Sequence, residues 1–493
     1  MSIIQINELT FCYENSYNIL FDHVSFQLDT DWKLGFIGRN GRGKTTFLKL
    51  LMKQYAYTGS IHASEDFAYF PFPIENPSAI TLHILEHLNP DIELWQISKE
   101  LNQMETCPGD ILYRPFCTLS QGEQTKVLLA ALFLRENTFL LIDEPTNHLD
   151  AQARQKVADY LSSKKGFILV SHDRAFLDTC IDHVLVLNRQ NIEVQKGNFS
   201  SWYANKQATD RLEEARNAKL KKDIRKLDIA SKRTSIWADK IEQTKTGTRT
   251  AGLRPDRGHI GHQSAKMMKR AKSLEARQQT ALIEKRGLLK NIEKVPPLKL
   301  NPLNFHTDRL LSLQKLTVTY DKKPLFAPLT LELHTGDRIA LTGKNGYGKS
   351  SILKLLVGKA IPFQGNYTIA SGLKISYVPQ DASFLRGTLP DFAEKANINE
   401  ALFKTVLAHL GIPSNQFEQN MELFSEGQKK KILLASSLCQ EAHLFLWDEP
   451  LNFIDIFSRM QLEELLLKYK PTLLFIEHDH TFTQNIATEI IPL

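Results

Sequence analysis

The stretch GRNGRGKTT, residues 38–46, decides the fold of the first half of the chain. It follows the apolar run LGFI and precedes FLKLLMK, so a strand, a glycine-rich loop and a helix are expected in succession. Glycines let backbone N–H groups close around a phosphate, and a helix N-terminus favours negative charge. Lys44 is expected to reach the β- and γ-phosphates of a nucleotide, and the Thr45 hydroxyl to bind Mg²⁺. The candidate nucleotide-binding residues of this loop are Gly38, Asn40, Gly41, Gly43, Lys44, Thr45 and Thr46.

A second copy, GKNGYGKSS, begins 305 residues later and follows the apolar run IALT. Its candidate nucleotide-binding residues are Gly343, Asn345, Gly346, Gly348, Lys349, Ser350 and Ser351, with Ser350 matching Thr45 as a metal ligand. A single match to this pattern can arise by chance in an ordinary α/β loop. Other motifs at fixed distances from each loop therefore decide whether the match is meaningful.

These motifs repeat in the same order and at the same spacing. Each loop lysine stands 99 residues before an Asp–Glu pair that ends an apolar strand, namely Asp143–Glu144 and Asp448–Glu449. A serine stands 23 residues before each pair, in LSQGE and FSEGQ, and a later strand is followed by a histidine in FILVSHD and FIEHD. Two ordered copies make accidental loops a poor explanation, and they predict an α/β fold with two P-loop ATPase domains.

Length and composition indicate a multidomain globular protein. The 493 residues exceed what one hydrophobic core accommodates, and no run of about 18 apolar residues predicts a membrane span. The N-terminal stretch MSIIQINELTFCYEN has no secretion-signal pattern, and the five cysteines form no CxxC pair. We expect free thiols and a cytoplasmic location.

The two copies resemble ATP-binding cassette (ABC) ATPases fused in one chain. By that resemblance, Asp143 and Asp448 hold Mg²⁺, Glu144 and Glu449 orient the attacking water, and His172 and His478 sense the γ-phosphate. Tyr13 and Tyr320 resemble the aromatics that stack on adenine, although packing within a strand is the alternative for each. The signature residues Ser120 and Gly122 would complete the ATP site of the second cassette, and Ser425 and Gly427 that of the first. ATP would then join the cassettes, and its hydrolysis would release them.

The two sites depart from the family pattern in different ways. YVPQ supplies Gln380 as the expected metal-ligating glutamine of the second cassette, whereas the matching YFPF has Phe72. Either Glu75 substitutes for it, or the first site coordinates its metal differently. In the second cassette Phe424 and Glu426 alter the signature, and PLNFID replaces PTNHLD. We therefore expect two ATP sites with different turnover rates.

The segment between the cassettes is basic. From position 204 to 294 it holds 24 Lys and Arg against 11 Asp and Glu, a balance of +13, so the remainder (37 against 44) has a balance of −7. Residues 205–243 and 264–294 have helical composition and recurring apolar positions, which predicts an antiparallel coiled-coil hairpin ended by Pro296–Pro297. We expect a first ATPase domain at 1–203, a linker at 204–297 with a tip loop at about 244–263, and a second ATPase domain at 298–493.

Twin cassettes joined by such a linker resemble the ABC-F family of ribosome-associated ATPases. The segments GFIGRNGRGKTT, FILVSHDRAF and WDEPLN resemble the corresponding sequences of its antibiotic-resistance group, especially those of Lsa-type ribosome protection proteins. The resemblance implies a monomer that binds the tRNA exit site of the bacterial 70S ribosome in the ATP-closed state. Its linker would contact 23S rRNA and P-site tRNA and dislodge lincosamides, streptogramin A compounds and pleuromutilins. The tip residues expected to make these contacts are Arg249, Arg254, Arg257, His259, His262, Lys266, Lys269 and Arg270.

Three other functions use the same motifs. A housekeeping ABC-F translation factor that relieves stalled ribosomes shares every one of them. The ATPase component of a drug exporter would need a membrane partner, and a DNA-repair ATPase with a coiled coil would carry zinc-binding cysteines, which this linker lacks. A basic linker can also be a solvated spacer, but this one is longer than a fusion of two cassettes needs.

Overall fold

The computed structural model describes residues 2–13, 19–90, 92–147, 149–188, 192–243, 298–320, 323–344 and 346–493, together with 266, 269, 272–273 and 276–277. The chain forms two compact units, one made of Met1–Trp202 with Pro296–Leu493 and the other of Tyr203–Val295. The first unit contains both predicted ATPase domains, which we call the first and the second cassette. Tyr320 lies at the end of a described strand but its side chain falls outside the described residues, as does the whole of Asn345.

The first cassette has two sheets and seven helices among its described residues. Its strands are β1 (Ile3–Cys12), β2 (Ile19–Asp29), β3 (Lys33–Ile37), β4 (Thr58–His62), β5 (Asp66–Phe70), β6 (Thr138–Asp143), β7 (Phe167–Val170), β8 (His183–Leu187) and β9 (Ile192–Lys196). Its helices are α1 (Lys44–Leu51), α2 (Thr81–Leu88), α3 (Leu94–Gln103), α4 (Pro108–Leu112), α5 (Gln121–Phe133), α6 (Ala151–Ser163) and α7 (Arg174–Cys180), with a 3₁₀ turn at Phe116–Thr118. The antiparallel sheet has the order β2-β1-β4, and the larger sheet has the order β5-β6-β7-β3-β8-β9.

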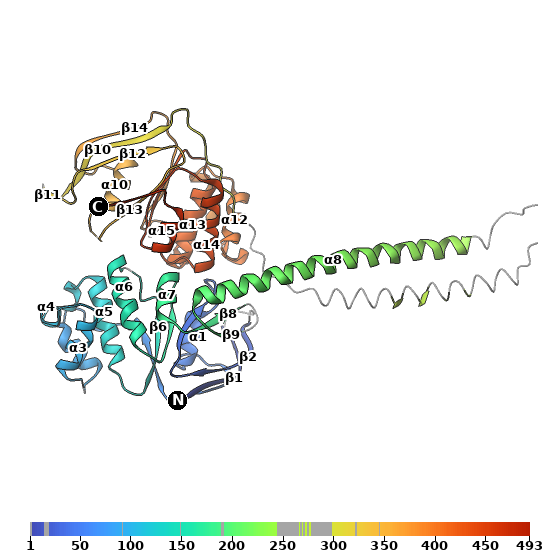
Figure 1. The fold of residues 1–493 in the computed structure, drawn as a ribbon, viewed down its shortest axis with the longest axis horizontal. Coiled ribbons are helices and arrows are strands. Elements are labelled where there is room, and N and C mark those ends of the chain that lie inside the picture. The colour runs from blue at the N-terminus through green and yellow to red at the C-terminus, as the bar shows by residue number, and fades with distance from the viewer. Residues whose placement is uncertain are drawn as a thin grey trace, which may run out of the picture. The chain divides into compact units, whose positions relative to one another are not determined.

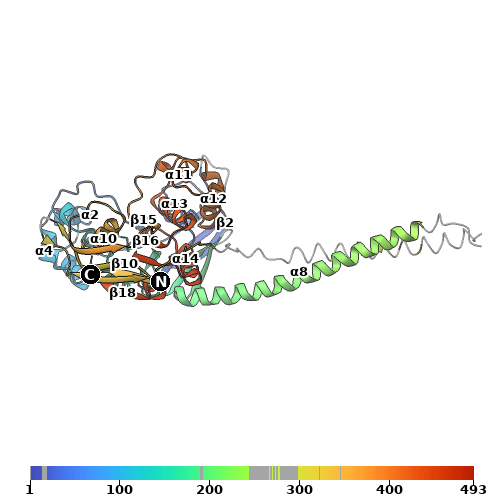
Figure 2. The same ribbon diagram turned by 90° about the horizontal axis from the view of Figure 1, so that it is seen from above.

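The second cassette repeats this plan. Its strands are β10 (Arg309–Tyr320), β11 (Lys323–Pro324), β12 (Leu329–His334), β13 (Arg338–Thr342), β14 (Phe363–Ile369), β15 (Ile375–Val378), β16 (Leu444–Asp448), β17 (Leu473–Ile476) and β18 (Glu489–Pro492). Its helices are α10 (Lys349–Leu356), α11 (Leu389–Lys395), α12 (Glu400–His409), α13 (Glu426–Cys439), α14 (Ile456–Tyr469) and α15 (His480–Ile486), with 3₁₀ turns at Ser414–Gln416 and Met421–Leu423. The parallel sheet has the order β15-β16-β17-β13-β18, and β10 pairs with β11, β12 and β14 in an antiparallel sheet. Figure 2 shows α11, α12 and α13 lying together in this cassette.

Strand β16 shows how the layers are held together. Because successive side chains of a strand point to opposite faces, Leu444 and Leu446 join one core and Phe445 and Trp447 join another. The first core lies against the antiparallel sheet and α10, and the second lies against helices α11 to α15. The central parallel strands β7, β16 and β17 are buried on both faces, which explains why they read as continuous apolar runs.

The strand order places the motifs at one edge of each parallel sheet. In the first cassette β6, β7 and β3 are neighbours, and in the second β16, β17 and β13 are neighbours. The carboxyl ends of these strands carry the Asp–Glu pair, the histidine and the glycine-rich loop, respectively. Ligands of open α/β sheets bind at this edge.

Helix α8 (Phe199–Gln243) begins in the first unit and continues from Tyr203 in the second, and Figure 1 draws it as one unbroken helix. At 1.5 Å per residue its 45 residues span about 68 Å. The helix begins before the predicted residue 205, because the Asn198 side chain accepts a hydrogen bond from the Ser201 amide at 3.0 Å and caps it. Phe199 and Trp202 are buried, and the Ser200 amide donates to Asp178 Oδ1 at 2.8 Å, which ties this first turn to the first cassette.

The predicted second helix of the linker is described only in part. Lys266 and Lys269 are helical and exposed, and 272–273 and 276–277 are helical as well. The tip residues Arg249, Arg254, Arg257, His259, His262 and Arg270 lie outside the described residues, so the coiled-coil pairing and the tip loop stay predictions. No helix of the part of the chain that the structure describes is long and apolar enough to cross a membrane.

Candidate nucleotide sites

We name the two sites by their loops: site A contains residues 38–46 and site B contains residues 343–351. In site A the loop joins β3 to α1, and Gly43 at the helix N-cap has φ 98°, a left-handed conformation that favours glycine. Gly348 occupies the same place before α10 with φ 78°. Both helices therefore present their N-terminal amides toward the loop, as phosphate binding requires.

The loop lysines are buried and held by backbone carbonyls. The Lys44 Nζ atom donates to the Gly38 carbonyl at 2.7 Å and to Asn40 Oδ1 at 3.3 Å. The Lys349 Nζ atom donates to the carbonyls of Gly343 and Lys344 at 2.7 and 2.8 Å. Burial lowers the pKa of Lys44, and the nearby Asp455 and Glu144 carboxylates oppose this change. Phosphate oxygens in place of these neutral carbonyl oxygens would give each ammonium a charged partner.

The hydroxyl and carboxylate expected to hold Mg²⁺ meet in both sites. Thr45 Oγ1 donates to Asp143 Oδ2 at 2.9 Å, and Ser350 Oγ donates to Asp448 Oδ1 at 2.9 Å. Asp448 Oδ2 is buried without a hydrogen-bond partner, and burial raises the pKa of Asp448 to about 6. Burial also raises the pKa of Asp143. Hard oxygen donors with an unsatisfied carboxylate oxygen suit a Mg²⁺ ion that keeps part of its water shell.

The two glutamates share a strained backbone but differ in their surroundings. Glu144 and Glu449 have φ values of 50° and 48°, in the left-handed region that non-glycine residues adopt uncommonly. Glu449 Oε2 accepts hydrogen bonds from Gln380 Nε2 at 2.9 Å and from Asn452 Nδ2 at 2.6 Å. Glu144 Oε1 is buried without a hydrogen-bond partner and lies 3.3 Å from His172 Nε2.

This difference gives the two carboxyl groups opposite pKa shifts. Burial, with the neighbouring Asp143 carboxylate, raises the pKa of Glu144 to about 8. Burial alone would raise the pKa of Glu449, but the neighbouring His478 and the Gln380 amide lower it to about 2. Burial also holds the pKa of His172 well below its ordinary value, so this imidazole is neutral. The two sites are electrostatically unequal.

Site A lacks a glutamine where site B has Gln380. Phe72 stands there, and the guanidinium of Arg135 lies over its ring at 5.9 Å from the centroid. Glu75 is exposed. A residue that sequence reasoning missed, Tyr69, donates a hydrogen bond from its hydroxyl to Asp143 Oδ2 at 3.0 Å. It lies in β5, three residues before Phe72 at the altered glutamine position, but no sequence pattern predicts its contact.

Site A is closed by the second cassette. The Asn40 Nδ2 atom donates to the carbonyl of Phe453 at 2.9 Å. A Cβ atom placed on Gly427 would lie 2.6 Å from the Phe453 carbonyl oxygen and 3.5 Å from Asn40 Nδ2. Ser425 caps α13 beside Gly427, with its Oγ accepting from the Gln428 amide at 3.3 Å. The structure thus places the signature of the second cassette beside the loop of the first.

Site B contains a cavity of about 600 Å³ that both cassettes line. From the second cassette it is lined by Gly346, Gly348, Lys349, Ser350, Ser351, Gln380, Glu449 and His478, among others. From the first it is lined by Gln121, Leu149 and Arg154. Gln121 directly follows Ser120, which caps α5 through a hydrogen bond from the Glu123 amide at 3.3 Å. Gly122 follows Gln121 in α5, and a Cβ atom on it would lie 3.4 Å from Leu149, another residue that lines the cavity.

The candidate adenine-stacking residue Tyr13 has features of both sequence interpretations. Its hydroxyl shares a hydrogen bond of 2.6 Å with Thr46 Oγ1 in the loop of site A. Its ring makes edge contacts with Phe11 and Tyr55, at centroid distances of 5.1 and 5.9 Å. Tyr13 is still 43% exposed.

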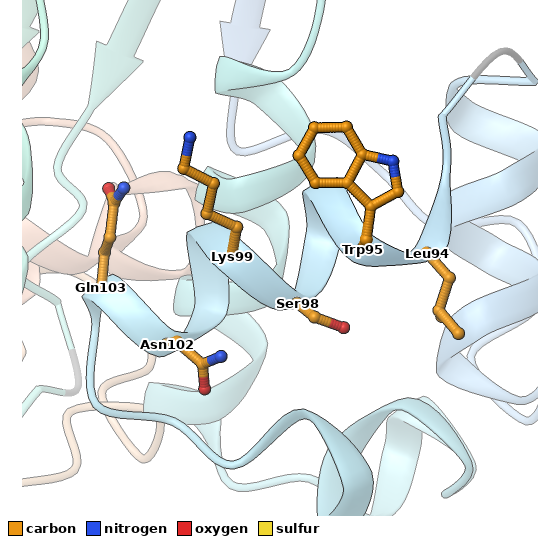
Figure 3. Close-up of a pocket in the computed structure, with 6 residues that line it drawn as sticks. All are labelled: Leu94, Trp95, Ser98, Lys99, Asn102 and Gln103. Carbon is orange, nitrogen blue, oxygen red and sulfur yellow. The ribbon is translucent and has the colours of Figure 1, made fainter.

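A second cavity, of about 710 Å³, lies away from these loops along α3. Figure 3 shows its six lining residues, and all of them come from this one helix. Trp95 and Lys99 point to one side of the helix and Leu94 and Asn102 to the other. None of the six belongs to a loop, a signature or an Asp–Glu pair, so the cavity is no part of the nucleotide sites.

Comparison with known proteins agrees with this geometry. The sequence profile of the family described as ABC transporter matches residues 21–147 and 326–452, which is just over half of the chain. The ribosome protection protein VmlR of Bacillus subtilis is 27% identical over 96% of this chain and 84% of its own length. The ATP-binding protein Uup of Buchnera aphidicola is 26% identical over 99% of this chain and 80% of its own length.

A solved structure shares the fold. It is the complex of the archaeal ribosomal stalk protein aP1 with the archaeal ribosome recycling factor aABCE1. Its match has a TM-score of 0.60 and 18% identity, and covers 98% of this chain and 87% of that chain. This likeness supports the tandem arrangement of two nucleotide-binding domains.

Proposed function

This chain belongs to the ABC transporter family and is an ATPase with two ATP-binding cassettes, and we propose that it acts on the bacterial ribosome. In the ATP-closed state it binds the tRNA exit site of the 70S particle. Its linker then reaches toward the peptidyl transferase centre, where it contacts 23S rRNA and P-site tRNA and dislodges lincosamides, streptogramin A compounds and pleuromutilins. ATP hydrolysis releases the protein.

The nucleotide sites act as a switch between open and closed cassettes. ATP in site A contacts Lys44 and Thr45 on one side and Ser425 and Gly427 on the other, so it joins the two cassettes. The contact between Asn40 and Phe453 supports this arrangement, because it already brings the loop and the opposing signature together. ATP in site B occupies the cavity between Lys349 and Gln121. Cleavage to ADP and phosphate removes the group that holds both sides.

The chemistry in each site divides among the chain's own residues. Glu144 and Glu449 orient the attacking water, and His172 and His478 contact the γ-phosphate. Thr45 with Asp143, and Ser350 with Asp448 and Gln380, would hold a Mg²⁺ ion, which supplies charge neutralisation of the phosphate oxygens. Backbone amides at the N-termini of α1, α10, α5 and α13 supply further fixed positive charge.

The linker carries the ribosome proposal. It is a basic segment, with 24 Lys and Arg against 11 Asp and Glu from position 204 to 294, whereas the rest of the chain has 37 against 44. The first turn of its helix α8 packs against the cassettes. Trp202 is buried there, and the centroid of its ring lies 6.3 Å from that of Phe457 in the second cassette. A change in the cassettes is therefore transmitted to the helix. Positive charge on a long helix suits entry into a cavity walled by RNA phosphates.

The relatives favour this class of function over a transport role. VmlR is named a ribosome protection protein, and one matching structure is described as ribosome-bound archaeal Pelota and ABCE1. A housekeeping role in relieving stalled ribosomes predicts the same ribosome binding without drug protection. Location in the cytoplasm, on the ribosome, follows from either role.

Drug susceptibility tests the proposal and separates these roles. Cells that express the chain should survive higher lincosamide, streptogramin A or pleuromutilin concentrations than cells that lack it. A variant whose residues 247–262 are a neutral Gly/Ser loop should lose this protection and keep its ATPase activity. Equal protection by both proteins would contradict the role of the tip, and no protection by the unaltered chain would favour the housekeeping role.

A further inference from the structure

Helix α13 carries two adjacent lysines that are both buried and point to different sites. Lys430 is 2% exposed, and its Nζ atom donates to the carbonyls of Pro379 and Gln380 at 2.8 Å each. A third carbonyl, that of Asp448, accepts from the same atom at 3.3 Å. Three backbone acceptors on one ammonium bind the helix to the segment that carries Gln380 and to the end of β16. Both of these belong to site B.

The next residue connects the same helix to site A. The Lys431 Nζ atom donates to the Leu410 carbonyl at 2.7 Å and to Asp455 Oδ2 at 2.8 Å, and both charged side chains are almost fully buried. Asp455 in turn interacts electrostatically with Lys44 of site A. The N-terminus of the helix, with Ser425 and Gly427, faces the Asn40 loop as described above.

A displacement of α13 would therefore move residues in both ATP sites. A buried ammonium that loses its carbonyl partners is costly, so the Gln380 backbone and the helix move together rather than separately. The Gln380 amide donates to Glu449 Oε2 at 2.9 Å, which extends the connection to the glutamate of site B.

The first cassette lacks this connection at the matching position. Helix α5 has Thr125 where α13 has Lys430, at the common offset of 305 residues. The Thr125 hydroxyl donates at 3.0 Å to the carbonyl of Gln121, which belongs to the same helix. A threonine side chain is also too short to span the distance that the lysine covers. The two signature helices thus differ in how they are tied to their own ATP sites.

We propose that Lys430 is a positioning residue that couples the two ATP sites, by tying the signature helix that completes site A to the Gln380 segment of site B. The coupling passes through α13 and has no counterpart in α5. It rests on the two ATP sites of the cassettes and is independent of ribosome binding. Coupling between two sites commonly changes binding affinity by about 5- to 150-fold.

Turnover at site B, measured with site A filled or empty, tests this coupling in the purified full chain without ribosomes. Site A binds ATP but turns over slowly in Glu144→Gln, and it loses its phosphate-binding ammonium in Lys44→Ala. The ratio of the two ATPase rates reports how site A occupancy affects site B. We expect this ratio to differ from one by at least about fivefold, and to come within about twofold of one when Lys430→Met is added.

Controls separate coupling from misfolding. Lys429→Met removes the same charge one residue earlier in α13 and should keep the original ratio, whereas Lys430→Arg retains donors and should restore part of it. Lys430→Thr, which carries the residue of α5, provides a second variant if Lys430→Met unfolds early in a thermal melt. An unchanged ratio in a folded Lys430→Met or Lys430→Thr protein would overturn the proposal, as would a ratio near one in the original chain. A ribosome-binding failure would leave this ratio unaffected.

Discussion

The side chain of Asn40 donates a hydrogen bond of 2.9 Å to the backbone carbonyl of Phe453, a residue 413 positions later in the chain. The same carbonyl lies beside Gly427 of the second signature. The Phe453 carbonyl, in the turn after the second Asp–Glu pair, therefore lies between a phosphate-binding loop and the opposing signature. This contact makes site A a property of both cassettes.

Replacing Gly427 by alanine should disturb that contact. The added Cβ atom would lie 2.6 Å from the Phe453 carbonyl oxygen, which is backbone and cannot move aside cheaply. Overpacking of this kind costs about 1–3 kcal/mol, so ATP turnover at site A, read in a Glu449→Gln background, should fall by about 5- to 150-fold.

Gly122→Ala is the matched control. Its added Cβ atom would meet only Leu149, at an ordinary 3.4 Å. Turnover at site B, read in a Glu144→Gln background, should fall by a smaller factor. Equal losses from the two substitutions would argue against the steric role of Gly427.

The two glutamate-to-glutamine variants should leave unequal ATPase activity. Glu449 is ionised and held by Gln380 and Asn452, whereas burial keeps the pKa of Glu144 at about 8. Site B is then the faster site, so Glu449→Gln should remove more of the steady-state rate than Glu144→Gln. A phosphate-release assay on both single variants checks this, and equal residual rates would refute it.

Gln380→Phe should make site B resemble site A, because it installs the residue found at position 72. Glu449 would lose the hydrogen bond that Gln380 Nε2 donates at 2.9 Å. A hydrogen bond to a charged group is worth about 1.5–3 kcal/mol, so kcat at site B should fall by roughly 10- to 150-fold. The measurement is ATPase kinetics in a Glu144→Gln background, with Gln380→Glu as a comparison that keeps a polar group. An unchanged kcat would show that Gln380 does not position Glu449.

Trp202→Ala should destabilise the protein, because it removes a buried side chain from the first turn of α8. Trp202 is 3% exposed, and truncation of a buried tryptophan costs about 3–5 kcal/mol. Trp95, on α3 in Figure 3, is 59% exposed, and its replacement by alanine should change stability by no more than about 0.5 kcal/mol. Chemical unfolding of both variants measures the difference. Similar losses of stability in the two variants would mean that Trp202 does not hold the first turn of α8 as described.

The sequence predicted the repeated α/β fold because each motif is local. A glycine-rich loop, an acidic strand end and a histidine after a strand are short patterns, and their matched spacing in two copies removes the ambiguity of a single match. The strand order comes from the structure, which places Asp143, His172 and Gly38 after the ends of three neighbouring strands. The linker helix was predicted for the same reason, although its start was placed six residues late because Asn198 was not recognised as a cap.

Contacts across long sequence separations could not be predicted. Neither the Asn40–Phe453 hydrogen bond nor the position of Lys430 follows from any local pattern, because each depends on how distant elements pack. Tyr69 was overlooked because an aromatic residue at a strand end is usually part of the core, whereas its hydroxyl here reaches Asp143. The unequal pKa values of Glu144 and Glu449 likewise arise from burial and partners that only the folded chain reveals.

Pelleting with ribosomes tests the central claim most directly. The double variant Glu144→Gln/Glu449→Gln, which should trap ATP between the cassettes, is mixed with 70S particles at physiological salt and centrifuged with ATP or with ADP. We predict that the protein pellets with the ribosomes in ATP, remains in the supernatant in ADP, and is released as salt is raised. Protein that stays in the supernatant in ATP, under conditions where it demonstrably binds the nucleotide, would contradict the account.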